Sequence, residues 1–150
     1  MTKLLLAAAP CLLLLAAGCK ARPENIEIKD AWVRLSPVAG QPSAGYFKIE
    51  GGAEGTKLVS ISSPALRRVE LHESMTGGGM AKMKPVKDVD FDYRGRIAFE
   101  PGGKHAMIYG MPKDVQPGGR IPLTFAFNVA PPITIEAEVR TAGGESHSGH

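Results

Sequence analysis

The sequence predicts an all-β domain, either an antiparallel β-sandwich or a Greek-key barrel. Short runs of alternating or β-rich residues follow one another, and none of them shows a helical period. Clusters of turn-forming residues separate the runs in a chain that contains 18 Gly and 12 Pro. A length of 150 residues with 43% hydrophobic content is enough for one domain of ordinary size. This spacing of strands and turns is typical of sandwiches and Greek-key barrels.

Residues 1–18 are expected to be an export signal. Lys3 provides a cationic start, and the apolar run that follows is too short to span a membrane. Small residues precede Cys19, as in the lipobox of bacterial lipoproteins, where the cysteine is acylated and becomes the new N-terminus. The alternative is ordinary cleavage near the same place, with Cys19 left as a free thiol. The lipoprotein interpretation predicts a periplasmic protein that is anchored to a membrane by its N-terminal lipid.

The cysteines and the charges exclude several classes of protein. Cys11 leaves with the signal and Cys19 carries the lipid, so the folded domain has neither a thiol nor a disulfide. The chain has 18 Lys and Arg against 15 Asp and Glu, a formal net charge of +3. This balance does not indicate a nucleic-acid-binding protein.

The predicted β domain extends over residues 27–141. A short tether at 19–26 precedes it, and a tail at 142–150, rich in Gly, Ser and His, is expected to be disordered. The runs that predict strands are, in chain order, 26–35, 44–50, 56–63, 67–74, 80–86, 95–100, 104–111, 120–129 and 133–141. The turn-rich joints between them are 37–43, 51–55, 63–66, 76–79, 92–95, 101–103, 112–119 and 130–132.

Four side chains on these strands are candidate metal ligands. In the run 67–74, the alternation directs Val69 and Leu71 inward, which leaves His72 on the other face near the strand end. The other three candidates are Met83, His105 and Met107. Met83 follows His72 by 11 positions, His105 follows Met83 by 22, and Met107 follows His105 by 2. The last two stand on the same side of one strand because they are two residues apart.

At these positions the chain resembles the PCu(A)C family of periplasmic copper chaperones. The ligand pattern of that family is H-x10-M-x21-H-x-M, with Met common after the first His, and the four candidates fall on its four ligand positions. The resemblance covers most of the mature chain, through the segments DAWVR, AGYFKIE, VELHES, MAKMKPV, PGGKHAMIYGM and IPLTFAF. One position departs from the pattern, because Glu73 stands where the family often has Met. We expect this extra carboxylate to tune affinity or to favour an oxidised ion without removing the site.

The resemblance implies a cupredoxin-like fold that binds one Cu(I) near its surface through His72, Met83, His105 and Met107. It further implies a metallochaperone, not an enzyme, which delivers copper to the dinuclear copper A centre in the copper-bearing subunit of cytochrome c oxidase. A Sco-type thiol chaperone is a second implied partner. A periplasmic buffer that sequesters excess copper would use the same site, so the sequence leaves both roles open.

The residue types support Cu(I) independently of the family. Two polarisable thioethers and two neutral imidazoles suit Cu(I) and are poor ligands for Mg, Ca or Mn. Zinc is a weaker candidate because its sites favour Cys, His and carboxylate. A blue-copper site requires a Cys thiolate, and no cysteine follows Cys19. No arrangement of Ser, His and Asp in the sequence supports a hydrolase.

The remaining methionines are expected to fill the core. They are Met75, Met80 and Met111. Met75 and Met80 have an alternative role as spare thioethers in a mobile loop.

Other polar residues have simpler interpretations. His147 and His150 are interpreted as solvated tail residues, with weak capture of Cu(II) as the alternative. The lysines that flank the ligands, namely Lys82, Lys84 and Lys104, are interpreted as solubilising, with steering of an acidic partner as the alternative.

Overall fold

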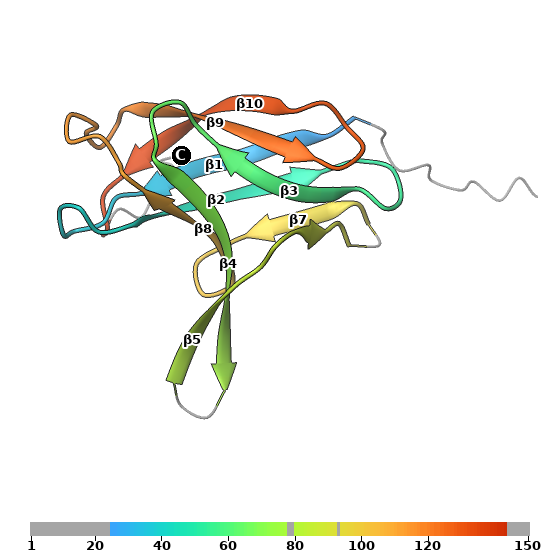
Figure 1. Cartoon of the computed structure of the whole chain (residues 1–150), viewed down its shortest axis with the longest axis horizontal. Coiled ribbons are helices and arrows are strands. Elements are labelled where there is room, and N and C mark those ends of the chain that lie inside the picture. The colour runs from blue at the N-terminus through green and yellow to red at the C-terminus, as the bar shows by residue number, and fades with distance from the viewer. Residues whose placement is uncertain (1–24, 78–79, 93, 144–150) are drawn as a thin grey trace, which may run out of the picture.

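The computed structural model describes residues 25–77, 80–92 and 94–143, and all of its regular elements are strands (Figure 1). The strands are β1 (Glu27–Arg34), β2 (Ser43–Glu50), β3 (Lys57–Ser62), β4 (Arg68–Gly77), β5 (Met80–Pro85), β6 (Val89–Asp90), β7 (Arg96–Phe99), β8 (Lys104–Tyr109), β9 (Arg120–Phe127) and β10 (Ile133–Arg140). The all-β prediction is confirmed. The predicted signal, Cys19 and most of the tether and tail lie outside the described residues.

Each of the nine predicted runs contains a strand, and the tenth strand, β6, was not predicted. It has two residues, which pair with Lys57 and Leu58 of β3. A strand this short carries no alternation that a sequence pattern can detect.

The strands form one sheet in the order β5-β4-β8-β2-β1-β10-β9-β3-β6, and β7 pairs with β2. The pairings are antiparallel except that β1 and β10 run parallel, with Trp32 opposite Glu138. A purely antiparallel sheet was therefore the wrong expectation at this one joint. Three pairs of strands adjacent in sequence, β1 with β2, β4 with β5 and β9 with β10, are antiparallel, whereas the parallel pair joins β1 and β10, the first and last strands of the described residues. Side chains alternate between the two faces in the same way in parallel and in antiparallel strands, so the sequence alternation does not indicate the direction of a strand.

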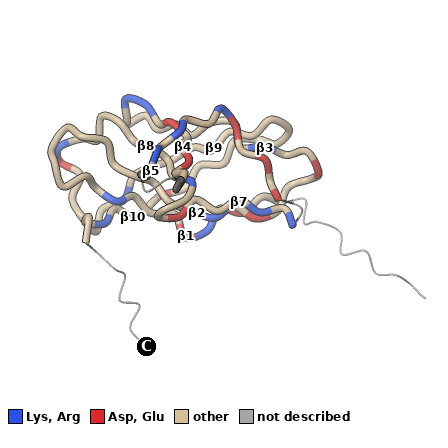
Figure 2. The backbone as a smooth tube through the Cα atoms, turned by 90° about the horizontal axis from the view of Figure 1, so that it is seen from below, with Lys and Arg blue, Asp and Glu red and all other residues tan. Residues whose placement is uncertain are grey.

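The sheet curls into two layers that enclose the core. Seen edge on in Figure 2, β3, β4, β8 and β9 lie on one side and β1, β2, β7 and β10 on the other. At the centre, Phe47 stacks on Phe99 with ring centres 4.3 Å apart and meets Phe125 edge-on at 4.8 Å. Such aromatic pairs add about 0.5–1.5 kcal/mol each beyond the burial of their area.

Two features of the sheet create the surroundings of the site. First, β2 changes partner along its length: Ser43–Gly45 pair with β8, whereas Phe47–Glu50 pair with β7. The part of β8 that precedes Ala106, which contains Lys104 and His105, is therefore not paired with β2. Second, the hairpin of β4 and β5 projects from the body of the sheet (Figure 1). The outer face near the base of this hairpin contains the candidate ligands.

Candidate metal centre

The strand registers place the four candidate ligands on one face of β5, β4 and β8. On β4, His72 lies directly opposite His105 of β8, and Glu70 lies opposite Met107. On the other side of β4, Met83 of β5 lies opposite Ser74. Residues directly opposite each other in antiparallel strands point to the same side, and so do residues two apart on one strand. The two imidazoles therefore form the middle of a row that has a thioether toward each end.

The other side of the same strands packs against the core, as the alternation predicted. Leu71, Ala106 and Ile108 are buried in the hydrophobic core, and Val69 packs against it. The buried neighbours fix the faces of β4 and β8, because a slip of one residue would turn the histidines into the hydrophobic core.

The two histidines form a close, largely buried pair. Their ring centres are 5.8 Å apart with an angle of 41° between the ring planes. His105 is 6% exposed, and the side chain of His72 is 12% exposed. A nitrogen-bound imidazole, with a metal–nitrogen bond of about 2 Å, has its ring centre roughly 3 Å from the ion. Two imidazoles that share one ion thus lie within roughly 6 Å of each other, which the observed spacing satisfies.

Each imidazole uses one ring nitrogen in a hydrogen bond and leaves the other without a partner. Nδ1 of His105 lies 3.1 Å from the carbonyl oxygen of Gly103, and Nε2 of His72 lies 3.2 Å from Oε2 of Glu70. Among the described residues, the buried side-chain nitrogen or oxygen atoms that lack a hydrogen-bond partner are Nδ1 of His72 and Nε2 of His105. A buried polar atom without a partner is costly, so this pair of free nitrogens indicates a ligand site.

The Glu70 carboxylate is held by three neighbouring side chains. Besides His72, it accepts a hydrogen bond from the hydroxyl of Tyr109 at 3.2 Å and pairs with Nε of Arg68 at 2.9 Å. The guanidinium of Arg68 also lies over the ring of Tyr109, 4.1 Å from its centre. The hydrogen bond from His72 is the main cause that lowers the pKa of Glu70 below its ordinary value. The carboxyl group is therefore an ionised acceptor at neutral pH.

A cavity of about 370 Å³ opens beside the histidine pair, where β8 leaves β2. Its lining residues are Arg34, Pro42, Ala44, Tyr46, Ser74, Met83, Gly102, His105 and Met107. Both candidate thioethers and one candidate imidazole thus meet in one cavity, and His72 adjoins it through its contact with His105. Met83 is 62% exposed, so at least one thioether is accessible from solvent.

An aromatic and cationic wall borders this cavity. The hydroxyl of Tyr46 lies 2.6 Å from the guanidinium of Arg34, and Trp32 lies against the ring of Tyr46 with centres 4.7 Å apart. Burial raises the pKa of Tyr46, against an opposing effect of Arg34. The tyrosine is therefore a neutral hydrogen-bond partner over the physiological range.

Glu73 does not face the candidate ligands. It is the next residue after His72 on β4 and points to the opposite face, where it pairs with Nζ of Lys104 at 2.9 Å. The expectation that this carboxylate would influence the metal directly finds no support in the geometry. Lys82 and Lys84 also point away from the ligand face, since they alternate with Met83. In Figure 2, basic and acidic residues are interspersed along the molecule.

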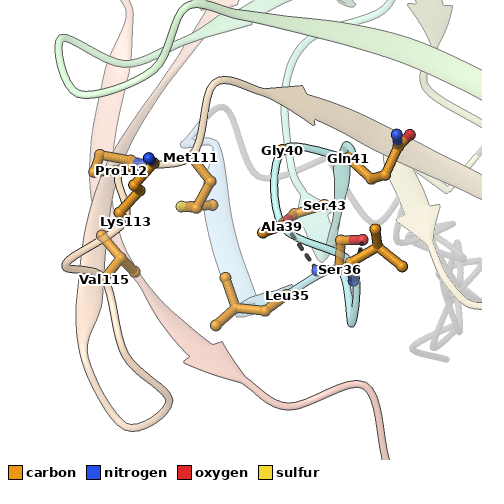
Figure 3. A pocket seen from close by; sticks show the side chains of 11 residues that line it. Leu35, Ser36, Ala39, Gly40, Gln41, Ser43, Met111, Pro112, Lys113 and Val115 are labelled. Atoms are coloured by element: carbon orange, nitrogen blue, oxygen red, sulfur yellow. Dashed lines mark hydrogen bonds between the residues drawn. The ribbon is translucent and has the colours of Figure 1, made fainter.

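Met75 and Met111 do not lie beside the four candidates. Met75 is 55% exposed, so its predicted role in the core is wrong, and it shares the face of Glu73 instead of that of His72. Met111 packs against the core as predicted, and its side chain points into a second pocket opposite Leu35 (Figure 3). That pocket shares no lining residue with the cavity at Met107.

Three further predictions cannot be placed. The side chain of Met80, together with His147 and His150, lies outside the described residues.

The described residues contain no cluster of three or more His, Cys, Asp or Glu that could hold a metal ion. The further candidate ligands beside the histidine pair are the thioethers of Met83 and Met107, which line the same cavity as His105. Two imidazoles with two thioethers are a soft, uncharged set that suits Cu(I).

Glu70, Arg34 and Tyr46 were not singled out from the sequence. The position of Glu70 two residues before His72 was a usable signal, because residues two apart share a strand face. The other two residues come from distant strands, and nothing local in the sequence relates them to the histidines.

The fold is that of the PCuAC domain. The solution structure of CuI-DR1885 from Deinococcus radiodurans is similar with a TM-score of 0.64 and 24% identity, over 85% of each chain. The copper-bound PCuAC domain from PmoF2 has a TM-score of 0.58 and 21% identity, over 81% of this chain and 96% of that domain. At these identities the likeness concerns the fold only. The fold that was expected from the resemblance to the PCu(A)C family is confirmed.

A family model described as "Putative lipoprotein LpqE-like" matches residues 26–139, and the chain belongs to this LpqE-like family. One relative is "Putative lipoprotein Lxx21020" of Leifsonia xyli, 22% identical over 84% of this chain and 77% of that protein. Another is "Uncharacterized protein RP573" of Rickettsia prowazekii, 35% identical over 57% of this chain and 49% of that protein. Within the described residues, no helix has the length and apolar character that crossing a membrane requires.

Proposed function

We propose that this protein is an exported copper carrier that binds one Cu(I) through His72, Met83, His105 and Met107. The observation that carries the proposal is the pair of buried ring nitrogens without partners, in a row that continues to a thioether on each side. The two similar structures, of CuI-DR1885 and of the PmoF2 domain, are of copper-bound proteins, which supports the same cargo here.

The ligand set also fits transfer of the ion. Neither thioether has to lose a proton when it binds or releases copper, and Met83 is exposed to an approaching partner. An acceptor can therefore replace the ligands one at a time. We propose that the acceptor is the copper A centre of cytochrome c oxidase, with a Sco-type thiol protein as a second partner, and that an acylated Cys19 anchors the carrier to a membrane facing the periplasm.

The test of copper binding is metal analysis of the domain from residue 25 onward under reducing and oxidising conditions. We expect one Cu(I) per chain, with sulfur and nitrogen around the metal by X-ray absorption, and no intense blue colour with Cu(II) because no thiolate is present. A preference for zinc over Cu(I), or a strong blue absorption band, would contradict the proposal.

Copper buffering is the alternative role for the same site. A deletion strain whose respiration fails and recovers with added copper would support delivery to the oxidase. Copper sensitivity with normal respiration would support buffering.

A further inference from the structure

We propose that Glu70 is a positioning residue that fixes the tautomer of His72, so that the metal is bound by Nδ1 of His72 and by Nε2 of His105. This inference rests on the proposed copper site and specifies which atom of each histidine binds. It also assigns to Glu70, Tyr109 and Arg68 a role that the ligand pattern does not contain.

The hydrogen-bond partners determine the two tautomers. The carbonyl oxygen of Gly103 can only accept, so Nδ1 of His105 carries the hydrogen and Nε2 retains its lone pair. The carboxylate of Glu70 pairs with Arg68 and accepts the hydroxyl hydrogen of Tyr109, so it is an acceptor toward His72 as well; Nε2 of His72 then carries the hydrogen and Nδ1 retains its lone pair. These two lone-pair nitrogens are the buried atoms without partners. The two histidines are thus prepared to bind through different ring nitrogens.

The carboxylate is itself held in place. Arg68 engages Oε1 of Glu70 at 2.9 Å, while His72 and Tyr109 both reach Oε2 at 3.2 Å. Metal-binding histidines commonly donate their second ring N–H to a carboxylate or a backbone carbonyl, which orients the ring and raises its basicity. Here one histidine uses each kind of partner. Loss of such a partner typically weakens metal affinity by about 10–100-fold.

Strand geometry explains why the two rings differ. Glu70 lies two residues before His72 on β4, on the same face, and directly opposite Met107 of β8. Its carboxylate therefore reaches the His72 ring from the Met107 end of the row. The ring of His105 is held from the other end by Gly103, which precedes it by two residues. The two rings are oriented from opposite ends, and this leaves a different nitrogen of each free.

The first experiment is nitrogen-15 NMR of the imidazoles in the metal-free domain, at a pH well above the ordinary pKa of histidine. We expect the Nε2–H tautomer for His72 and the Nδ1–H tautomer for His105. An Nδ1–H tautomer at His72 would overturn the inference without any metal being present.

The second experiment compares variants by the same NMR measurement and by competition with a Cu(I) chelator. Glu70→Ala should redistribute the tautomers of His72 and weaken Cu(I) binding by about 10–100-fold. Glu70→Gln should restore most of the affinity, because its amide oxygen still accepts a hydrogen bond from Nε2. Tyr109→Phe should have a smaller effect. The matched control is Glu73→Ala, which removes a carboxylate from the opposite face of β4 and should leave both measurements unchanged.

The outcomes separate this inference from the proposed function. If Glu70→Ala binds Cu(I) as wild type and keeps the same His72 resonances, the positioning role is wrong while the copper site stands. If Glu70→Gln is as weak as Glu70→Ala, a hydrogen-bond acceptor is not what Glu70 supplies, and the inference is again wrong. If wild type does not bind Cu(I), the proposed function fails, and the assignment of the binding atoms fails with it.

Discussion

Neighbouring residues of β8 have different roles. Alternate residues pack in the core, and the residues between them face the candidate metal site. Ala106 and Ile108 are fully buried, whereas Met107 lines the cavity beside His105. Successive side chains of a strand point to opposite faces, so a packing residue and a candidate ligand can be direct neighbours in sequence. A ligand on such a strand can be removed with little change in packing.

Met107→Ala should therefore weaken Cu(I) binding while the metal-free domain melts close to wild type. The loss of affinity should at least equal the roughly 10–100-fold expected when a supporting partner of a ligand is lost. Chelator competition and thermal melts measure the two quantities. A variant that melts far below wild type, and whose folded fraction still binds Cu(I) normally, would show that Met107 is a packing residue.

Ile108→Ala is the matched comparison and should behave in the opposite way. This side chain is fully buried, and its truncation should destabilise the domain by about 2–5 kcal/mol. The fraction that remains folded should keep its Cu(I) affinity.

At the scale of elements, a bulge in β1 determines which face Trp32 and Arg34 occupy. The register with β2 shifts between Lys29 and Trp32, and Asp30 has a φ of 52°. The shift changes the alternation within β1, so that Ile28 and Val33 both contact the core although they lie five positions apart. Without the bulge, the wall of the cavity would lose Arg34 to the other face.

Asp30→Val should destabilise the domain by about 1–2 kcal/mol, because a β-branched residue is strained in this left-handed conformation. Asp30→Gly should remain close to wild type, since glycine accepts positive φ. Chemical denaturation measures both variants, and the fluorescence of Trp32, the one tryptophan of the sequence, reports whether the bulge persists. Equal stability of the two variants would mean that the bulge imposes no steric requirement.

The turn after β8 depends on a glycine. Gly110 has a φ of 75°, and a Cβ atom there would lie 2.6 Å from Cβ of Arg67. Gly110→Ala should thus destabilise the pairing of β8 with β4 beyond the cost of the backbone conformation alone. Gly118→Ala is the control, because Gly118 has a φ of 87° but no atom within 4 Å of the added Cβ. Urea unfolding should place Gly110→Ala below Gly118→Ala, and the reverse order would contradict the steric argument.

At the scale of the whole molecule, the hydrophobic core and the candidate metal site lie on opposite faces of the curled sheet. The core lies between the two layers, and the candidate site lies on the outer face near the base of the projecting hairpin of β4 and β5 (Figure 1). The candidate ligands come from three strands of one sheet, which the core holds in register. The domain is therefore expected to have the same fold with and without copper.

The membrane anchor is the prediction that concerns the whole mature protein. If Cys19 is acylated, wild-type protein should partition with membranes and carry lipid by mass spectrometry, whereas Cys19→Ala should carry none. The Cys19→Ala domain should still bind Cu(I), because the four candidate ligands all follow residue 70. Wild-type protein recovered free of membranes with an unmodified Cys19 would contradict the lipoprotein assignment.

The strands and the faces of the candidate ligands could be predicted because they depend on local alternation. In a regular strand, His105 and Met107 share a face because they are two residues apart. Leu71 and His72 point to opposite faces because they are neighbours. The soft chemistry of two imidazoles and two thioethers was likewise contained in the residue types.

Strand pairing is long-range, and only the tertiary structure decided what depends on it. The strand registers placed Met83 opposite Ser74. They also brought Glu73 next to Lys104, with which it forms an ion pair. The strands β1 and β10 met in a parallel pair, and β8 left β2 where the cavity opens. The free nitrogens of the histidines also required structure, because a tautomer is set by the hydrogen-bond partner that folding supplies. Strand pairing is fixed by hydrogen bonds between segments far apart in sequence, and a pattern of period two does not say which strands pair. The partners of the two histidines lie only two residues away, yet the fold decides which ring nitrogen reaches them.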